Sequence, residues 1–400
     1  DAEAIGKIIS QRTLPTLTVT KPATPAPIGD LNFDINFPSG SNNPVINGIL
    51  QDGSRVWGQF NQNGQSQYFS VKVDGSQFVD FKIPNSLNTS IKYLNKEGTK
   101  VWGRYTDINN KQHIFSMKTD GTQFNDLTPS DCTDIDINGI TIDGNRIWGQ
   151  YRNSNNKIRI FLTNIDGTRT VDISPNNSTN SFIYGSNFDG TKLFGWYNDQ
   201  NENYHLFSIN ENYQHIDITP PNSVRSYIVG LTPNGQKVWG TFNDQDFKIH
   251  HFSINLDGTG FVDLTPPESA GSYLSNLSPD GTTFFGGFHD KNSQLHYFTI
   301  KVDGSEYHEL KQLNNNTASI NNFTPDGTKL FGFDTVPTLH PFTINIDGSE
   351  LVSLSPPNSN YSGINGITND SQRAWGQFSS KDGYQHLFTC LLYTSDAADD

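Results

Sequence analysis

The stretch Ile140–Tyr151 has the sequence Ile-Thr-Ile-Asp-Gly-Asn-Arg-Ile-Trp-Gly-Gln-Tyr. Two runs rich in β-branched and aromatic residues flank Asp-Gly, which is a strong signal for a β-hairpin turn. The same pattern recurs along the chain at intervals of 44 to 46 residues, with its second glycine at Gly58, Gly103, Gly149, Gly195, Gly240, Gly286, Gly332 and Gly376. Eight copies at so constant a period, each long enough for about four strands, are typical of a β-propeller.

The repeat predicts one eight-bladed β-propeller over residues 30–390, with each blade a four-stranded antiparallel sheet. In the fifth copy the strands are expected at 227–231, 237–242, 250–256 and 260–264. Tight turns join strands one and two and strands three and four, so these turns lie on one face of the disc. The longer connections lie on the opposite face, where we expect any binding surface, because binding residues concentrate on loops held by a rigid scaffold.

The two ends of the repeat complement each other. Residues 34–38 match residues 80–84 one period later, and the eighth copy ends after its third strand near Thr389. We therefore expect the N-terminal strand to complete the last blade and close the ring, which would cover a sheet edge. Residues 1–29, with their Thr- and Pro-rich part, predict a tail or linker. Residues 391–400 break the repeat and resemble translated adaptor sequence, so we expect them to be non-native.

Composition excludes several classes of partner. The hydrophobic content of 33% and aromatic content of 12% suit many short strands. A formal net charge of −14 without any Lys/Arg cluster argues against duplex nucleic acid and anionic membranes. No apolar run has the roughly 18 residues that a membrane span requires. The two cysteines form neither a disulfide framework nor a zinc pattern, and no signal peptide is visible.

One position of the third strand is a histidine in six copies: His113, His205, His250, His296, His340 and His386. A ring of imidazoles could bind metal or act as a base. One imidazole per blade is too widely spaced to share an ion at a bond length of about 2.0–2.1 Å, so we expect structural hydrogen bonds between strands. The residue before the repeated glycine is a tryptophan in five copies: Trp57, Trp102, Trp148, Trp239 and Trp375. We expect these rings to pack between blades rather than to stack on sugars.

Aspartates recur in the tight turns and at the fourth strand. Turn chemistry accounts for the turn aspartates, because an aspartate side chain hydrogen-bonds the backbone two residues on. Alternatively, such carboxylates could bind Ca²⁺, but no D-x-D-x-D-G loop is present. We expect no cofactor and no metal site.

Two known propeller repeats resemble this unit. Residues 137–149 with the His-Leu-Phe of residues 205–207 resemble the bacterial extracellular HAF repeat. Residues 254–266 and 324–330 resemble TolB-like propeller repeats. The resemblance covers residues 30–390. It implies a secreted or periplasmic, non-catalytic protein that binds other macromolecules, and it transfers no active site.

The leading function hypothesis is a secreted, monomeric, non-enzymatic binding module for a protein or a glycan. No out-of-pattern Ser/His/Asp set, phosphate loop or cysteine nucleophile breaks the repeat, which argues against an enzyme. A polysaccharide hydrolase or lyase working through carboxylates, and a purely structural repeat protein, are the alternatives. The expected ligand-binding residues on the long-loop face are Asn198, Tyr204, Phe247, His289 and Tyr384.

Overall fold

The computed structural model describes residues 35–50, 53–83, 85–95, 98–141, 146–187, 190–313, 317–335 and 339–392. Within these ranges the chain forms 31 strands and one 3-10 turn, η1 (Lys311–Leu313), so the protein is all-β, as predicted. In sequence order the strands form eight antiparallel units, which we call blades 1 to 8. Blades 1 to 7 have four strands each, and blade 8 has three among the described residues.

The first four blades contain strands β1 to β16. Their bounds are β1 (Ser41–Ile49), β2 (Arg55–Gln62), β3 (Gln65–Lys72), β4 (Val79–Asp80), β5 (Ser86–Leu94), β6 (Lys100–Asp107), β7 (Gln112–Lys118), β8 (Asn125–Asp126), β9 (Cys132–Ile140), β10 (Arg146–Asn153), β11 (Ile158–Asn164), β12 (Val171–Asp172), β13 (Asn180–Ser186), β14 (Leu193–Asn198), β15 (Tyr204–Ile209) and β16 (His215–Asp217). A single parallel pair, Ile158 with Asn180, links blades 3 and 4.

The last four blades contain strands β17 to β31. Their bounds are β17 (Arg225–Leu231), β18 (Lys237–Asn243), β19 (Ile249–Asn255), β20 (Val262–Asp263), β21 (Gly271–Leu277), β22 (Thr283–His289), β23 (Leu295–Lys301), β24 (His308–Glu309), β25 (Ala318–Phe323), β26 (Lys329–Asp334), β27 (His340–Asn345), β28 (Val352–Ser353), β29 (Ser359–Ile367), β30 (Arg373–Ser380) and β31 (Gln385–Leu391). The four strands expected in the fifth copy are confirmed as β17 to β20, with ends that shift by one or two residues.

A second Asp-Gly pair recurs in the turn between strands three and four. In blade 5, Asp257 accepts hydrogen bonds from the backbone N–H of Thr259 at 2.9 Å and from its hydroxyl at 2.6 Å. Gly258 has a φ of +82°, which glycine adopts without steric cost. Side-chain chemistry and backbone freedom therefore reverse the chain within a few residues, and the same contacts recur in other blades.

The repeated glycine after Trp or Phe has a different cause. β17 carries an irregularity between Ile228 and Gly230, which brings a carbonyl oxygen over β18. A Cβ atom on Gly240 would lie only 1.8 Å from the carbonyl oxygen of Tyr227. The equivalent distance is at most 2.1 Å in the other seven blades, so each second strand requires glycine at this position.

The core lies between the blades rather than within them. Trp102 and Ile114 of blade 2 belong to one buried cluster with Ile147 and Phe161 of blade 3, and all four side chains are fully buried. In blades 1 to 6 the aromatic residue before the repeated glycine packs in a cluster with the next blade; these residues are Trp57, Trp102, Trp148, Phe194, Trp239 and Phe285. Burial of these aromatic side chains is the main stabilising contribution, because they remove the largest apolar area from water.

Hydrogen bonds also cross from blade to blade. The Ser70 hydroxyl on β3 donates to the carbonyl oxygen of Thr119 in blade 2 at 2.6 Å. The Thr299 hydroxyl on β23 donates to the carbonyl oxygen of Ile346 in blade 7 at 2.5 Å. A buried hydroxyl that finds a backbone acceptor fixes the register of neighbouring blades.

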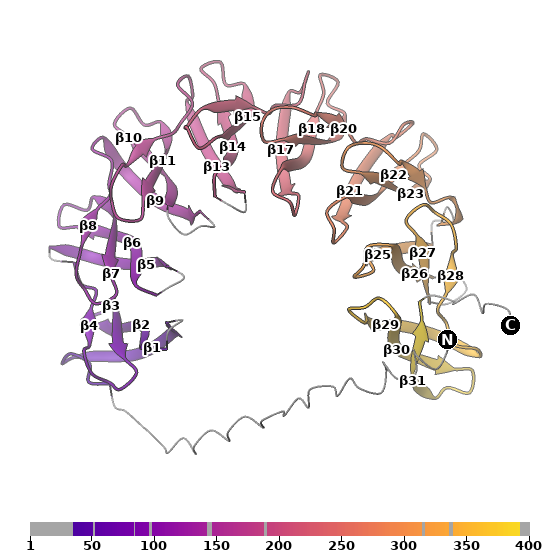
Figure 1. Cartoon of the computed structure of the whole chain (residues 1–400), viewed down its shortest axis with the longest axis horizontal. Helices are drawn as coiled ribbons and strands as arrows, with labels where there is room; N and C mark the ends of the chain where they lie inside the picture. Colours follow the sequence, from indigo (N-terminus) through magenta and orange to yellow (C-terminus); the bar gives the residue numbers. More distant parts are fainter. Residues whose placement is uncertain are drawn as a thin grey trace, which may run out of the picture.

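The predicted closed ring is not present in this structure. Figure 1 shows the blades in an open arc, with the first strands on the inner rim and a gap between blade 1 and blade 8. Ile35 and Phe37 pack on blade 1, where the Phe37 ring lies 5.1 Å from that of Phe69. Asp34, which was expected in the closing strand, lies outside the described residues. Within the described chain, β31 therefore has a partner on one side only.

The open arc exposes two apolar faces. Trp375 and Leu387 of blade 8 are 48% and 84% exposed, whereas the equivalent Trp102 and Ile114 of blade 2 are fully buried. At the other end, Ile46 of blade 1 is 57% exposed. These residues belong to the repeated packing positions, so they are exposed because the first and last blades have no further neighbour.

The C-terminal boundary extends beyond its predicted position. β31 runs to Leu391, and the backbone N–H of Leu392 donates to the carbonyl oxygen of Gln372 at 3.0 Å. Leu392 is buried beside Leu354 and Ala374. The first two residues of the segment expected to be non-native thus continue blade 8. The described part of the chain has no helix whose length and hydropathy would suit a membrane span.

Candidate functional site

A cavity of about 710 Å³ lies between blades 4 and 5. Three other cavities measure about 210, 290 and 460 Å³. The residues that line the larger cavity are Tyr184, Trp196, Asn198, Glu202, Asn203, Tyr204, Val224, Arg225, Tyr227, Asn243 and Phe247. It includes residues of the β14–β15 and β18–β19 connections, which belong to the set of joins expected to carry a binding surface.

Aromatic rings from three strands of blade 4 and one of blade 5 meet at this cavity. Trp196 of β14 and Tyr204 of β15 stack with their centroids 5.1 Å apart and their planes 17° apart. Tyr227 of β17 lies 5.8 Å from Tyr204 in a tilted arrangement. The hydroxyl of Tyr184 on β13 lies 3.2 Å from that of Tyr204. The cluster spans the boundary between two blades and leaves ring surface open to a ligand.

Phe247 contributes a fifth ring from a strained turn. The Asp244 side chain accepts hydrogen bonds from the backbone N–H groups of Asp246 and Lys248, both at 2.9 Å. This turn places Phe247 at a φ of +61°, a left-handed conformation that bulky residues rarely adopt. In blades 2 and 3 the equivalent residue is an asparagine, which tolerates this conformation. Phe247 is also 74% exposed. Its backbone conformation therefore costs free energy that burial of the ring does not offset.

Polar groups complete the lining. The guanidinium carbon of Arg225 lies 5.2 Å from the centre of the Tyr227 ring, within the range of a cation–π contact. The Asn198 amide donates to the Glu202 carboxylate at 3.3 Å. The side-chain oxygen Oδ1 of Asn198 is buried and accepts no hydrogen bond from the described residues. A buried acceptor of this kind is suited to a ligand hydroxyl.

The hydroxyls of Tyr184 and Tyr204 remain protonated at neutral pH. Burial raises the pKa of Tyr204 far above its usual range, and the hydrogen bond with Tyr184 acts in the same direction. Burial also raises the pKa of Tyr184. Both hydroxyls are therefore neutral and can donate as well as accept hydrogen bonds.

Three of the five predicted ligand-binding residues lie together in this cavity, namely Asn198, Tyr204 and Phe247. His289 is an exposed residue at the end of β22 in blade 6 and does not line it. Tyr384 lies in the β30–β31 turn of blade 8 and is 68% exposed. His289 and Tyr384 belong to other blades and are therefore separate from this cavity.

Sequence reasoning missed Trp196, Tyr184, Tyr227 and Arg225. The sequence contains a signal for Trp196. This residue follows the repeated glycine, and no other blade has a tryptophan at that position. The equivalents are Gln59, Arg104, Gln150, Thr241, Gly287, Phe333 and Gln377. At this position only blades 4 and 7 have an aromatic residue, so the comparison of copies points to these two blades.

The repeated histidines connect strands within each blade. In blade 5, His250 lies 3.0 Å from the Asp263 carboxylate and 3.1 Å from that of Asp244, and it stacks on Phe242 at 4.9 Å. His113 and His296 have the same two kinds of carboxylate contact. Both ring nitrogens of His250 thus have carboxylate partners.

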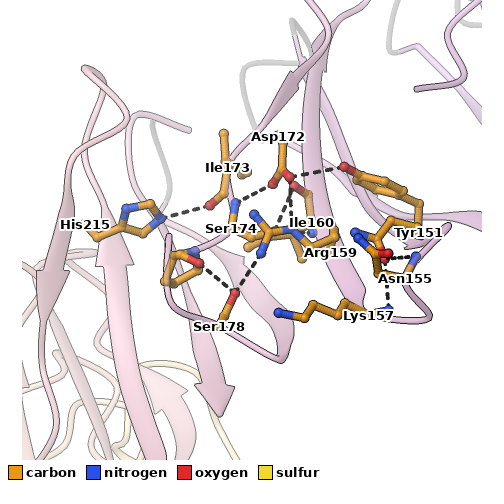
Figure 2. Close-up of polar contacts among 12 residues, drawn as sticks. Tyr151, Asn155, Lys157, Arg159, Ile160, Asp172, Ile173, Ser174, Ser178 and His215 are labelled. Carbon is orange, nitrogen blue, oxygen red and sulfur yellow. Dashed lines mark hydrogen bonds and ion pairs between the residues drawn. The ribbon is translucent and has the colours of Figure 1, made fainter. Parts of the chain in front are cut away.

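Blade 3 has Arg159 at the histidine position (Figure 2). Its Nε donates to Asp172 at 2.9 Å, and its Nη1 donates to the Ser178 hydroxyl at 3.1 Å. The Tyr151 hydroxyl donates to the same Asp172 carboxylate at 3.1 Å. A cation therefore replaces the imidazole while the link between the third and fourth strands is kept.

The five repeated tryptophans differ in their burial. Trp102 and Trp148 are buried between blades, Trp57 and Trp239 are half-buried, and Trp375 is exposed at the end of the arc. Among the described residues, no group of three or more His, Cys, Asp or Glu side chains is arranged to hold a metal ion.

Comparison with known proteins gives similarity of architecture only. The sequence matches no described protein family, and no curated protein matches it. Dipeptidyl peptidase 4 from Porphyromonas gingivalis is 10% identical with a TM-score of 0.42, covering 84% of this chain and 57% of the peptidase. This chain thus spans little more than half the length of that protein.

Two further solved structures are similar. TolB from Acinetobacter baumannii is 15% identical with a TM-score of 0.31, covering 76% of this chain and 80% of TolB. The β-propeller domain of the Trilobed protease from Pyrococcus furiosus is 12% identical with a TM-score of 0.35, covering 77% of this chain and 99% of that domain. These similarities assign neither an activity nor a ligand to this chain.

Proposed function

We propose that this protein is a non-enzymatic binding module that holds an oligosaccharide in the cavity between blades 4 and 5. The observation that carries the proposal is the meeting of Trp196, Tyr204, Tyr227 and Phe247 at one open cavity with amide and charged groups beside them. Sugar rings present apolar C–H faces and polar edges. Aromatic rings can pack against the apolar C–H faces, and amide groups can hydrogen-bond the polar edges, so the lining of the cavity matches this chemistry.

The size of the cavity favours a glycan over a folded protein. Ligand sites of about 300–1,000 Å³ are typical for small molecules, and this cavity measures about 710 Å³. A stable protein interface needs about 800 Å² on each partner, which is usually spread over a broad surface. A protein ligand is therefore the second choice for this site.

The test uses substitutions taken from the repeat itself. Trp196→Gln introduces the residue that blades 1, 3 and 8 have at this position, so the blade should still fold. We expect an oligosaccharide identified on a glycan array to bind Trp196→Gln about 10- to 100-fold more weakly, which corresponds to about 1.5–3 kcal/mol of lost stacking. Phe333→Gln, the equivalent change in blade 7 outside the cavity, is the matched control and should bind normally.

Two results would contradict this proposal. One is the absence of any glycan ligand on the array while the circular dichroism spectrum is that of folded β protein. The other is release of products from a bound polysaccharide, abolished by a single Asp→Asn change, which would favour the hydrolase or lyase alternative.

We also propose that the arc closes into an eight-bladed ring. Trp375 and Leu387 on blade 8 are exposed, and so is Ile46 on blade 1, although these positions are packing positions inside the arc. The closing strand would come from residues near Asp34, one repeat before Asp80, which pairs with Phe69 in blade 1. Burial of both end faces provides the driving force.

The proposed location is outside the cytoplasm, either secreted or periplasmic. Support comes from the resemblance of the repeat to HAF and TolB-like repeats. Fractionation of cells that express the full-length native gene, with immunodetection in the medium and periplasm, tests this location. Recovery of the protein in the cytoplasmic fraction alone would contradict it.

A further inference from the structure

One arginine, Arg225, lines the cavity between blades 4 and 5. Arg225 lies at the start of β17, exposed, and its guanidinium rests over the Tyr227 ring at 5.2 Å. Among the described residues it forms no ion pair. By contrast, Arg159 bonds Asp172 at 2.9 Å. In a chain with a net charge of −14, an arginine that stays unpaired beside a cavity is available to an anionic ligand.

Neutral hydrogen-bond donors also line the cavity. The Tyr184 and Tyr204 hydroxyls are 3.2 Å apart, so one can donate to the other while the second donates outward. The positive charge of Arg225 acts on the pKa of both hydroxyls, in opposition to burial, which indicates that the guanidinium lies near the pair. A guanidinium fork with adjacent O–H donors suits a planar carboxylate.

Hydrogen-bond acceptors line the cavity as well. The Glu202 carboxylate lies on the β14–β15 turn, where it accepts the Asn198 amide at 3.3 Å, and the Asn198 Oδ1 atom has no donor among the described residues. These oxygens suit sugar hydroxyls and would repel a second carboxylate. The lining of the cavity therefore combines a cation from blade 5 with acceptors from blade 4 and aromatic rings from both blades.

We propose that the ligand is an oligosaccharide that contains uronic acid. This inference rests on the proposed function and specifies its ligand class. The uronate carboxylate bonds Arg225, the sugar ring packs on the aromatic surface of Trp196 and Phe247, and the ring hydroxyls donate to Asn198 and Glu202.

The experiment compares acidic ligands with their methyl esters by isothermal titration calorimetry. The probes are oligogalacturonate, oligomannuronate and glucuronate-containing oligosaccharides, each measured beside its fully methyl-esterified form, together with neutral hits from the array. We expect one acid to bind about 10- to 100-fold more tightly than its ester, since charge-assisted hydrogen bonds contribute about 1.5–3 kcal/mol. Added salt should reduce this difference.

The matched variants are Arg225→Gln and Arg169→Gln. Arg169 makes the same kind of contact over Tyr213, at 4.9 Å, but does not line the cavity. Arg225→Gln should lower the affinity for the acid to that of the ester and leave the affinity for the ester unchanged. Arg169→Gln should change neither. Equal circular dichroism spectra and thermal midpoints show that both variants fold.

The outcomes separate this inference from the proposed function. If acid and ester bind equally, or if only neutral glycans bind, and Trp196→Gln weakens that binding, the uronate assignment is wrong and the glycan site stands. The assignment is also wrong if Arg225→Gln and Arg169→Gln bind the acid equally well. If no oligosaccharide binds at all, both proposals are wrong.

Discussion

Replacing Trp102 and Trp375 by alanine, in two separate variants, tests whether the arc closes. The two tryptophans occupy the same position of the repeat, but Trp102 is fully buried and Trp375 is 48% exposed. Full burial of an indole removes about 200 Å² from water, or about 5 kcal/mol at about 25 cal/mol per Å². Measured losses for such substitutions are about 3–5 kcal/mol. In the open arc, Trp375→Ala should cost about half as much as Trp102→Ala.

Closure changes this expectation. If blade 1 covers blade 8 in solution, Trp375 is buried as Trp102 is, and both variants should lose about 3–5 kcal/mol of unfolding free energy. We expect this equality, because we propose that the ring closes. Urea unfolding followed by far-UV circular dichroism gives both free energies, and unchanged m-values show that the variants unfold from equally compact states.

Leu387→Asp makes the same test sharper. Leu387 is 84% exposed in the arc, so the open form should tolerate the change within about 0.5 kcal/mol. In a closed ring the carboxyl would occupy a site like that of Ile114, which is fully buried, and desolvation should cost about 3 kcal/mol or more. A half-sized effect of Trp375→Ala together with a neutral Leu387→Asp would refute closure and leave the open arc as the state in solution.

Three further predictions concern pH and the strained turn. Hydrogen bonds from the Lys248 N–H and from His250 lower the pKa of Asp244, so its stabilisation is present above about pH 4 and is lost as pH falls through its folded pKa. Asp244→Asn should therefore make the decrease of the urea midpoint below about pH 4 smaller than in the unsubstituted protein. An unchanged decrease would contradict this. Burial lowers the pKa of His251, so stability should fall as pH decreases below about 6.5. His251→Leu should remove that decrease, and a decrease of the same size in the variant would show that another group causes it. Phe247→Asn should raise the unfolding free energy by about 1 kcal/mol by relieving the left-handed strain, and it should weaken glycan binding. A lower unfolding free energy in Phe247→Asn would show that packing of the Phe247 ring stabilises the protein by more than the left-handed conformation destabilises it.

The sequence predicted the parts of the fold that depend on short-range chemistry. Asp257 and Gly258 define a turn through contacts within three residues, and Gly240 reports a steric requirement that recurs in every blade. Because these causes are local and repeat eight times, the number of units and the order of their strands could be predicted from the chain alone. Asn198, Tyr204 and Phe247, which the loop pattern singled out, line the cavity, and their role in binding stays a prediction.

Only the tertiary structure shows where the residues of the cavity meet and that a gap separates blade 1 from blade 8 (Figure 1). Trp196, Arg225 and Phe247 come from two different blades, and their meeting depends on the rotation of blade 5 against blade 4, which turn chemistry does not specify. Local hydrogen bonds fix each blade, while side-chain packing between blades fixes the shape of the whole and the site within it.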